Sequence, residues 1–190
     1  MGMPAAAPRI WTVAEVLELP DDGNRYEVVG GELLVSPSPR FDHQEAVMQL
    51  WSLLTPYLRE HLVGHAAVSP ADIEFSPIDL VQPDVFVVPL VNGKRPRNWS
   101  DVTALVLAAE VLSPSSARAD RVLKRALYRR QRVSEYWVVD TNARVVERWR
   151  PDDERPEIVE GMLTWQPVGA AMSLAIDLPA YFAQVLDAAD

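Results

Sequence analysis

The chain has 190 residues, a mass of 21.2 kDa and 48% hydrophobic residues, which suffices for one well-filled core. It lacks cysteine, which excludes disulfides and thiolate zinc sites, and it has no apolar run of about 18 residues, which excludes a membrane-spanning helix. The net charge of −9 argues against duplex binding through bulk positive charge. We expect a flexible N-terminus at residues 1–10 without a secretory signal, followed by one cytoplasmic domain at residues 11–190.

The first predicted elements are a short helix and a hairpin. Thr12 and Glu15 have the capping-box spacing, which predicts a helix through AEVLEL that stops at Pro20. The segment RYEVVGGELLVS predicts a hairpin closed by two glycines, because only residues that tolerate positive φ close such a turn well. In that register Glu27 and Glu32 share one face, opposite an apolar face.

A long helix is predicted over about residues 43–62. An apolar stripe recurs with the helical period, and Pro56 is expected to kink the helix. At about 100° per residue, His43 projects into this stripe whereas Glu45 points to water. The stripe consists of Ala46, Val47, Leu50, Leu53, Leu54, Tyr57 and Leu58.

Three extended segments follow, at about residues 67–76, 84–89 and 104–112. The last two are apolar on both faces, as expected of central strands. A second helix is predicted over about residues 116–132, with a polar row beside its apolar side. The apolar side comprises Ala119, Val122, Leu123, Ala126 and Leu127, and the polar row Asp120, Lys124, Tyr128 and Gln131.

The remaining chain predicts two hairpins and a closing helix. EYWVVD pairs with RVVERWR, EIVEG pairs with MLTWQPV, and DLPAYFAQVLDAAD forms the helix. The overall order predicts an α/β fold, with a mixed sheet flanked by helices. The C-terminal segment is rich enough in apolar residues to favour a homodimer, although packing onto its own sheet would use the same residues: Trp165, Tyr181, Phe182, Val185 and Leu186.

Three polar residues stand in apolar surroundings: Asp84, Glu110 and Lys124. Strand alternation puts each carboxylate on one face of its strand, so paired strands would bring the two side by side. Two close carboxylates that leave room for water suit Mg²⁺ or Mn²⁺. A lysine at the same point can orient or deprotonate the attacking water and stabilise charge on a phosphate. The three residues therefore indicate metal-assisted phosphodiester hydrolysis.

Each of the three has a structural alternative. Asp84 follows a proline and could cap a turn. Glu110 could be a buried partner of Arg125 or Arg148, and Lys124 could be solvated on a helix flank. Seven basic residues lie between 118 and 132, and such a run is usually a solvated helix face.

The order of motifs resembles the PD-(D/E)XK nuclease superfamily, in which a helix precedes strands whose second opens with Pro-Asp and whose third ends in Glu-x-Lys. Within it, RYEVVGGELLVSPSP, His43, VQPDVFVV, AAEVLSPSS, DRVLKRALY and VSEYWVVD resemble the Uma-two restriction endonuclease family. The match runs from about Trp11 to Trp149. The resemblance implies a restriction-endonuclease-like fold with added N- and C-terminal hairpins. It also implies that the protein hydrolyses DNA with Mg²⁺ or Mn²⁺.

By resemblance, Asp84 and Glu110 would be metal ligands, joined by the backbone carbonyl of Val111. The superfamily pattern has a lysine two residues after the glutamate, but this chain has Leu112 there. The Uma-two family looks like one in which the lysine has moved to the following helix, which selects Lys124. The long stem of a lysine on that helix flank can reach a strand end.

Glu27 and His43 would add an acid and an imidazole to this site, whereas Asp120 and Tyr128 would position the lysine. Glu27 could instead face solvent, and His43 could be a hydrogen-bonded core residue. Two other functions stay open. One is a nuclease-fold module that binds nucleic acid or protein without cutting, using the arginine helix and a dimer face, and the other is a small-molecule phosphoesterase.

Overall fold

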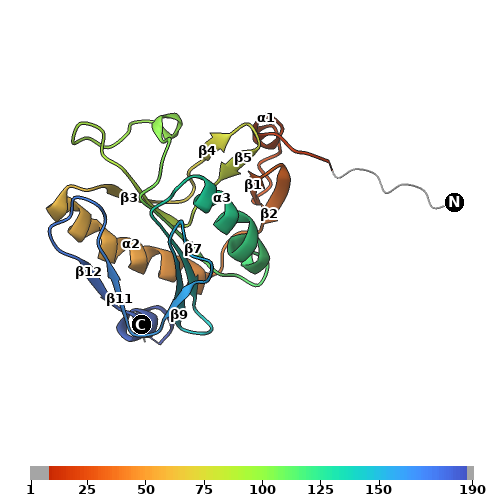
Figure 1. The fold of residues 1–190 in the computed structure, drawn as a ribbon. Helices are drawn as coiled ribbons and strands as arrows, with labels where there is room; N and C mark the ends of the chain where they lie inside the picture. Colours follow the sequence, from red (N-terminus) through yellow and green to blue (C-terminus); the bar gives the residue numbers. More distant parts are fainter. Residues whose placement is uncertain (1–8, 188–190) are drawn as a thin grey trace.

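A six-stranded mixed sheet with helices on both faces forms the centre of the computed structural model, which describes residues 9–187 (Figure 1). Most of the N-terminal segment predicted to be flexible, and the end of the predicted last helix, lie outside these residues. The elements are α1 (Val13–Leu17), β1 (Arg25–Val29), β2 (Glu32–Ser36), α2 (Phe41–His61), β3 (His65–Val68), β4 (Ile73–Ser76), β5 (Asp79–Val81), β6 (Val85–Val88), the 3₁₀-helix η1 (Trp99–Asp101), β7 (Leu107–Val111), the π-helix η2 (Ala119–Lys124), α3 (Arg125–Arg130), β8 (Glu135–Asp140), β9 (Val145–Trp149), β10 (Glu157–Val159), β11 (Met162–Trp165), β12 (Leu174–Asp177) and α4 (Leu178–Leu186).

The main sheet has the order β10-β9-β8-β7-β6-β3, and β7 and β8 run parallel. A smaller sheet has the order β2-β1-β5-β4, and β11 pairs with β12. The predicted α/β class, with a mixed sheet and terminal hairpins, is therefore confirmed. None of the helices within residues 9–187 is both long and apolar enough to cross a membrane.

Both faces of the central strands are buried, which explains their continuous apolar sequences. On one face, Val85, Ala109 and Val139 pack with α2 and α4. On the other, Phe86 and Ala108 pack with α3 and the smaller sheet. Figure 1 shows α2 along one side of the sheet and α3 on the other.

The pairing of β6 with β7 sets the positions of the two predicted carboxylates. Val85 lies opposite Ala109, so one more step along this register puts Asp84 opposite Glu110. Directly opposite residues of antiparallel strands point to the same face. Asp84 and Glu110 therefore both face η2 and α3.

The N-terminal elements follow the prediction. Thr12 and Glu15 form a capping box, and Glu27 pairs with Leu34 in the expected hairpin register. The apolar face of the hairpin packs on α1 through Val28. Glu27 itself is buried, because its face of the hairpin is turned toward the main sheet.

The buried face of the second helix was predicted only in part, because Leu127 is buried and Leu123 packs against the same core. Val122 is 55% exposed and Ala126 is exposed, whereas Asp120, Lys124 and Tyr128 of the polar row are buried. The N–H of Arg125 donates to Asp120 O, the five-residue step of a π turn, which changes the register that a regular 3.6-residue period predicts. Polar partners on the sheet make burial of this row possible.

Two strand assignments are also corrected. The predicted strand at 67–76 is two strands in different sheets, with Pro70 between them where a ladder N–H would be missing. The predicted pairing of EIVEG with MLTWQPV does not form, since β10 extends the main sheet and β11 pairs with β12. This arrangement turns Leu163 and Ile176 into the core beside α2.

The C-terminal aromatic residues serve the chain's own core. Trp165, Tyr181 and Phe182 are buried together with side chains of α2. The Tyr181 hydroxyl donates to Ala46 O of α2 at 2.8 Å. These aromatic residues therefore pack onto the same chain, which is the alternative to a dimer interface that the sequence left open.

Candidate active site

Four carboxylates and one ammonium meet where β1, β6 and β7 face η2. All five residues are at most 4% exposed: Glu27, Asp84, Glu110, Asp120 and Lys124. Burial of this much charge is costly unless the groups are paired with one another. The geometry of the cluster therefore decides what it can do.

Lys124 is the shared cation of the cluster. Its Nζ lies 2.9 Å from Glu27 Oε1, 3.1 Å from Glu110 Oε1 and 3.6 Å from Asp120 Oδ1. Burial alone lowers the pKa of Lys124, but the charges of Glu110 and Glu27 outweigh it and raise the pKa above its ordinary value. Lys124 is therefore an ammonium here, suited to orienting groups and stabilising negative charge.

Glu110 has one satisfied and one unsatisfied oxygen. Oε1 accepts from Lys124 Nζ and from the Tyr128 hydroxyl at 3.0 Å, whereas Oε2 is buried without a hydrogen-bond partner. Burial raises the pKa of Glu110 well above its ordinary value, although Lys124 opposes the shift, and the charge of Asp84 raises it further. One ammonium is thus shared by three acids, and burial favours the neutral form of Glu110.

Asp84 is held as a carboxylate by three donors. Arg25 Nη1 donates to Oδ1 at 2.8 Å, and the Val111 N–H donates to Oδ2 at 2.9 Å. His43 Nε2 lies 3.2 Å from the same Oδ2. Burial raises the pKa of Asp84, but the hydrogen bond from His43 and the charge of Arg25 bring it below its ordinary value.

Val111 contacts Asp84 through its N–H, whereas the carbonyl was predicted to join the metal ligands. The next N–H, of Leu112, donates to Val139 O on β8. Successive residues of a strand direct their backbone groups to opposite edges. The Val111 carbonyl therefore points to the β6 edge, where Asp84 lies.

The predicted residues thus come together, including the lysine from the following helix. The structural alternatives for Glu110 are wrong, because Arg125 stacks over Trp149 at 3.8 Å and Arg148 pairs with Glu157 at 2.6 Å. The solvated alternatives for Lys124 and Glu27 are wrong as well. Tyr128 hydrogen-bonds Glu110, whereas it was expected to position the lysine.

Arg25 is the site residue that sequence reasoning missed. Besides Asp84, its guanidinium approaches Glu27, with Nε 3.7 Å from Oε2. Burial lowers the pKa of Arg25, but the charges of Asp84 and Glu27 outweigh it, so the pKa is raised. The available signal was strand alternation, since residues 25 and 27 must share a face of the hairpin.

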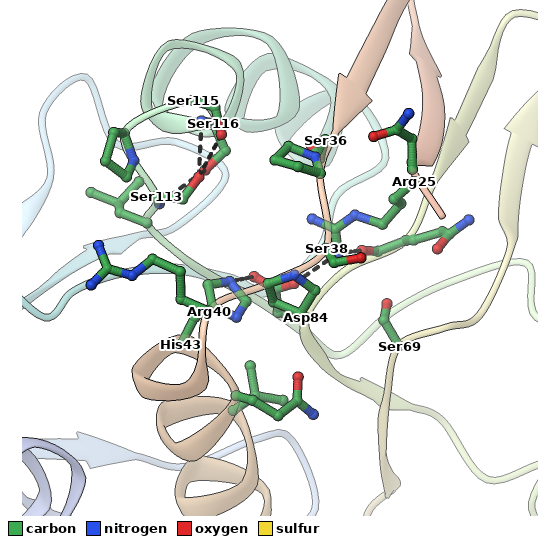
Figure 2. Close-up of a pocket in the computed structure, with 18 of the residues that line it drawn as sticks. Arg25, Ser36, Ser38, Arg40, His43, Ser69, Asp84, Ser113, Ser115 and Ser116 are labelled. Atoms are coloured by element: carbon green, nitrogen blue, oxygen red, sulfur yellow. Dashed lines mark hydrogen bonds and ion pairs between the residues drawn. The ribbon is translucent and has the colours of Figure 1, made fainter. Parts of the chain in front are cut away.

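A pocket of about 670 Å³ opens onto this cluster (Figure 2). Figure 2 shows His43 and Asp84 in contact, with Arg25 beside them. Glu110 and Lys124 do not line the pocket and lie behind Asp84. Two Ser-Pro segments contribute most of the hydroxyls: Ser36, Ser38, Ser113, Ser115 and Ser116, with Ser69 from the β3–β4 connection.

The donor set fits a divalent cation. Four carboxylates face two cations, Lys124 and Arg25, and Glu110 Oε2 is an unpartnered buried oxygen. Within residues 9–187, no three His, Cys, Asp or Glu side chains are arranged as a metal site. A cation would therefore be held by two carboxylates with main-chain oxygen and water, as Mg²⁺ often is.

The arginine-rich segment is largely neutralised by acids. Arg121 pairs with Glu147 at 2.6 Å and with Asp140 at 3.0 Å. Arg130 pairs with Asp79 at 3.1 Å. Most of the basic residues in this segment therefore have an acidic partner, and Arg129 is exposed without one among residues 9–187.

This fold, with an Asp-Glu pair on adjacent strands and a lysine behind it, defines a restriction-endonuclease-like α/β protein. A model of the Uma2 family, described as "Putative restriction endonuclease", matches residues 13–179. The chain belongs to the Uma2 family. A comparison with curated proteins found no significant match.

Among solved structures, the fold is similar to a crystal structure of a "putative nuclease belonging to DUF820" from Anabaena variabilis. The TM-score is 0.76 at 19% sequence identity, over 92% of this chain and 99% of the other. At this identity the likeness concerns the fold.

Proposed function

We propose that the protein is a metal-dependent nuclease that hydrolyses phosphodiester bonds in DNA. The observation that carries the proposal is the placement of Asp84 opposite Glu110 on one face of the sheet, with an unpartnered Glu110 oxygen. Excess buried negative charge next to an open pocket is costly for a purely structural core. The same arrangement suits a site that takes up a cation.

In this proposal Asp84, Glu110 and the Val111 carbonyl would hold Mg²⁺ or Mn²⁺. The bound ion would supply a water of lowered pKa and stabilise charge on the phosphate. Lys124, as an ammonium, would stabilise negative charge on the same group. Tyr128 and Arg25 hold the two carboxylates in place, and His43 Nε2 lies 3.2 Å from Asp84 Oδ2.

Cleavage of DNA by wild type and by matched variants tests the proposal. Asp84→Asn and Glu110→Gln should each lower Mn²⁺-dependent cleavage at least about a hundredfold. Asp72→Asn is the control, because its exposed carboxylate lies outside the cluster and accepts from the Gln82 side chain at 2.9 Å. Cleavage that survives Asp84→Asn, or that needs no divalent ion, would contradict the assignment.

A small-molecule phosphoesterase is the second candidate, because the pocket volume of about 670 Å³ falls in the range of small-ligand sites. Hydrolysis of a nucleotide that outcompetes DNA cleavage would favour it. Metal binding without hydrolysis of either substrate would instead favour the non-cleaving module.

Exposed apolar side chains still favour the predicted homodimer. Met162, Val168 and Met172 of the C-terminal segment are exposed. Replacing all three by serine should shift a dimer toward monomer in light scattering. A measured mass equal to that of one chain for the wild-type protein would contradict the homodimer.

A further inference from the structure

Unpaired positive charge is concentrated at one end of the molecule. Eleven of the 18 lysines and arginines have a carboxylate within ion-pair distance among residues 9–187. Four of the others lie at the end of α2 and in the β6–β7 connection. We call these the distal basic patch: Arg59, Lys94, Arg95 and Arg97, all exposed.

The patch is built on ordered backbone. Val91 and Lys94 exchange hydrogen bonds of 2.8 and 3.1 Å across a turn. Asn92 and Gly93 have φ of 52° and 72°, the left-handed pair that closes a tight hairpin turn. Trp99 then fixes the connection to the sheet by packing on Phe86, with ring centroids 5.8 Å apart.

Arg59 and the connection lie close together although they are far apart in the sequence. Four residues after α2 ends, β3 begins at His65, which pairs with Val88, the last residue of β6 before the connection starts. The charges of Arg95 and Arg59 also act on His65, whose pKa is lowered mainly by burial. Figure 1 shows the β6–β7 connection beside β3, at the end of the sheet away from β1 and β2.

Acids nearby do not form ion pairs with the patch cations among residues 9–187 and are outnumbered by them. Asp101 accepts from the Asn98 N–H at 3.2 Å, which keeps its carboxylate in the cap of η1. Glu60 is exposed next to Arg59 on α2 and is not within ion-pair distance of a patch cation. A local cluster of cations therefore persists on a chain of net charge −9.

The helix α2 gives the separation between the patch and the candidate active site. His43, which contacts Asp84, and Arg59 are 16 residues apart on this helix. A rise of 1.5 Å per residue makes this about 24 Å. That span corresponds to about seven base pairs at 3.4 Å per step.

We propose that the distal basic patch binds the phosphate backbone of a nucleic acid, as a second contact on a substrate that also enters the pocket. The ligand class, a nucleic acid, rests on the proposed function. Phosphate neutralisation by exposed lysine and arginine is the usual source of sequence-independent affinity. Guanidinium groups match phosphate geometry especially well.

Binding without turnover tests this inference separately from cleavage. The full-length chain is titrated into fluorescent DNA of about 20 base pairs, long enough to span both contacts, in EDTA. Arg95→Gln/Arg97→Gln is compared with Arg129→Gln/Arg155→Gln, which removes the same charge from exposed, unpaired arginines elsewhere. Thermal melts check that both variants are folded.

The patch variant should bind about tenfold more weakly, and its salt dependence should fall by about two counterions. The control should stay within about twofold of wild type. Equal losses in both variants, or no loss in either, would overturn the inference, as would a wild type that binds acidic peptide as tightly as DNA. A chain that binds DNA through the patch but never cuts it would overturn only the nuclease proposal.

Discussion

At the residue scale, the site is an electrostatic compromise around a single ammonium. Glu27, Glu110 and Asp120 all approach Lys124 Nζ, so each acid is only partly compensated. Burial raises the pKa of Asp120, as it does that of Glu110, and the charge of Lys124 offsets this only in part. Removal of the ammonium should therefore be far more costly than the loss of one surface ion pair.

Lys124→Met should lower the free energy of unfolding by about 3–5 kcal/mol, because it leaves buried carboxylates without their cation. Urea denaturation measures the loss. The chain has one other lysine, Lys94, which is exposed, and Lys94→Met should change stability by less than about 0.5 kcal/mol. Equal effects of the two substitutions would show that Lys124 does not neutralise the cluster.

The raised pKa of Glu110 predicts a pH-dependent effect of Glu110→Gln. A folded pKa above the unfolded value of about 4.5 means that Glu110 supports folding when protonated, and that this contribution is lost as the pH rises through the folded pKa. Glutamine is uncharged at every pH, so the variant does not lose this contribution as the pH rises. The melting temperature of the variant minus that of wild type should therefore increase from pH 4.5 upward, without added metal.

Glu45→Gln is the control for this measurement, because Glu45 is exposed on α2. Its melting temperature difference should stay flat with pH. A flat profile for Glu110→Gln as well would mean that Glu110 is an ordinary ionised carboxylate in the folded protein.

At the element scale, the second helix shows what periodicity can and cannot predict. Its position was predicted, but its buried face was assigned by hydrophobicity, which favoured Val122 over Lys124. Hydrophobicity fails here because the sheet end that the helix covers carries acids and because the π turn changes the register.

Val122→Glu tests which face of this helix is buried, and Leu127→Ala, at a position buried in both the predicted and the observed face, is the reference for a core substitution. Val122→Glu should change the free energy of unfolding by less than about 0.5 kcal/mol, since Val122 is 55% exposed. Leu127→Ala should cost about 2–5 kcal/mol, because Leu127 is fully buried. Chemical denaturation separates the two, and a large loss for Val122→Glu would restore the face that the sequence favoured.

At the scale of the whole molecule, local patterns were sufficient for the hairpin register, the long helix and the central strands. Alternation along β6 and β7 even predicted that Asp84 and Glu110 share a face. The pairing of β10 with the neighbouring strand β9 was missed because EIVEG was paired with the segment that follows it. The short strand β5 could not be predicted, because its partner β1 is distant in the chain. The role of Arg25 was missed for the same reason, since its contact with Asp84 joins residues 59 positions apart.

Metal binding should stabilise the whole molecule, because a cation that balances the buried acids binds the folded chain alone. At a concentration of Mn²⁺ about 100 times its dissociation constant, the free energy of unfolding should rise by about 2.7 kcal/mol. For a domain of this size, that is an increase in melting temperature of about 5–10 °C. Calorimetry should show the increase in wild type and in Asp72→Asn but not in Asp84→Asn. An increase of equal size in Asp84→Asn would place the cation elsewhere, and no increase in wild type would argue against a metal site.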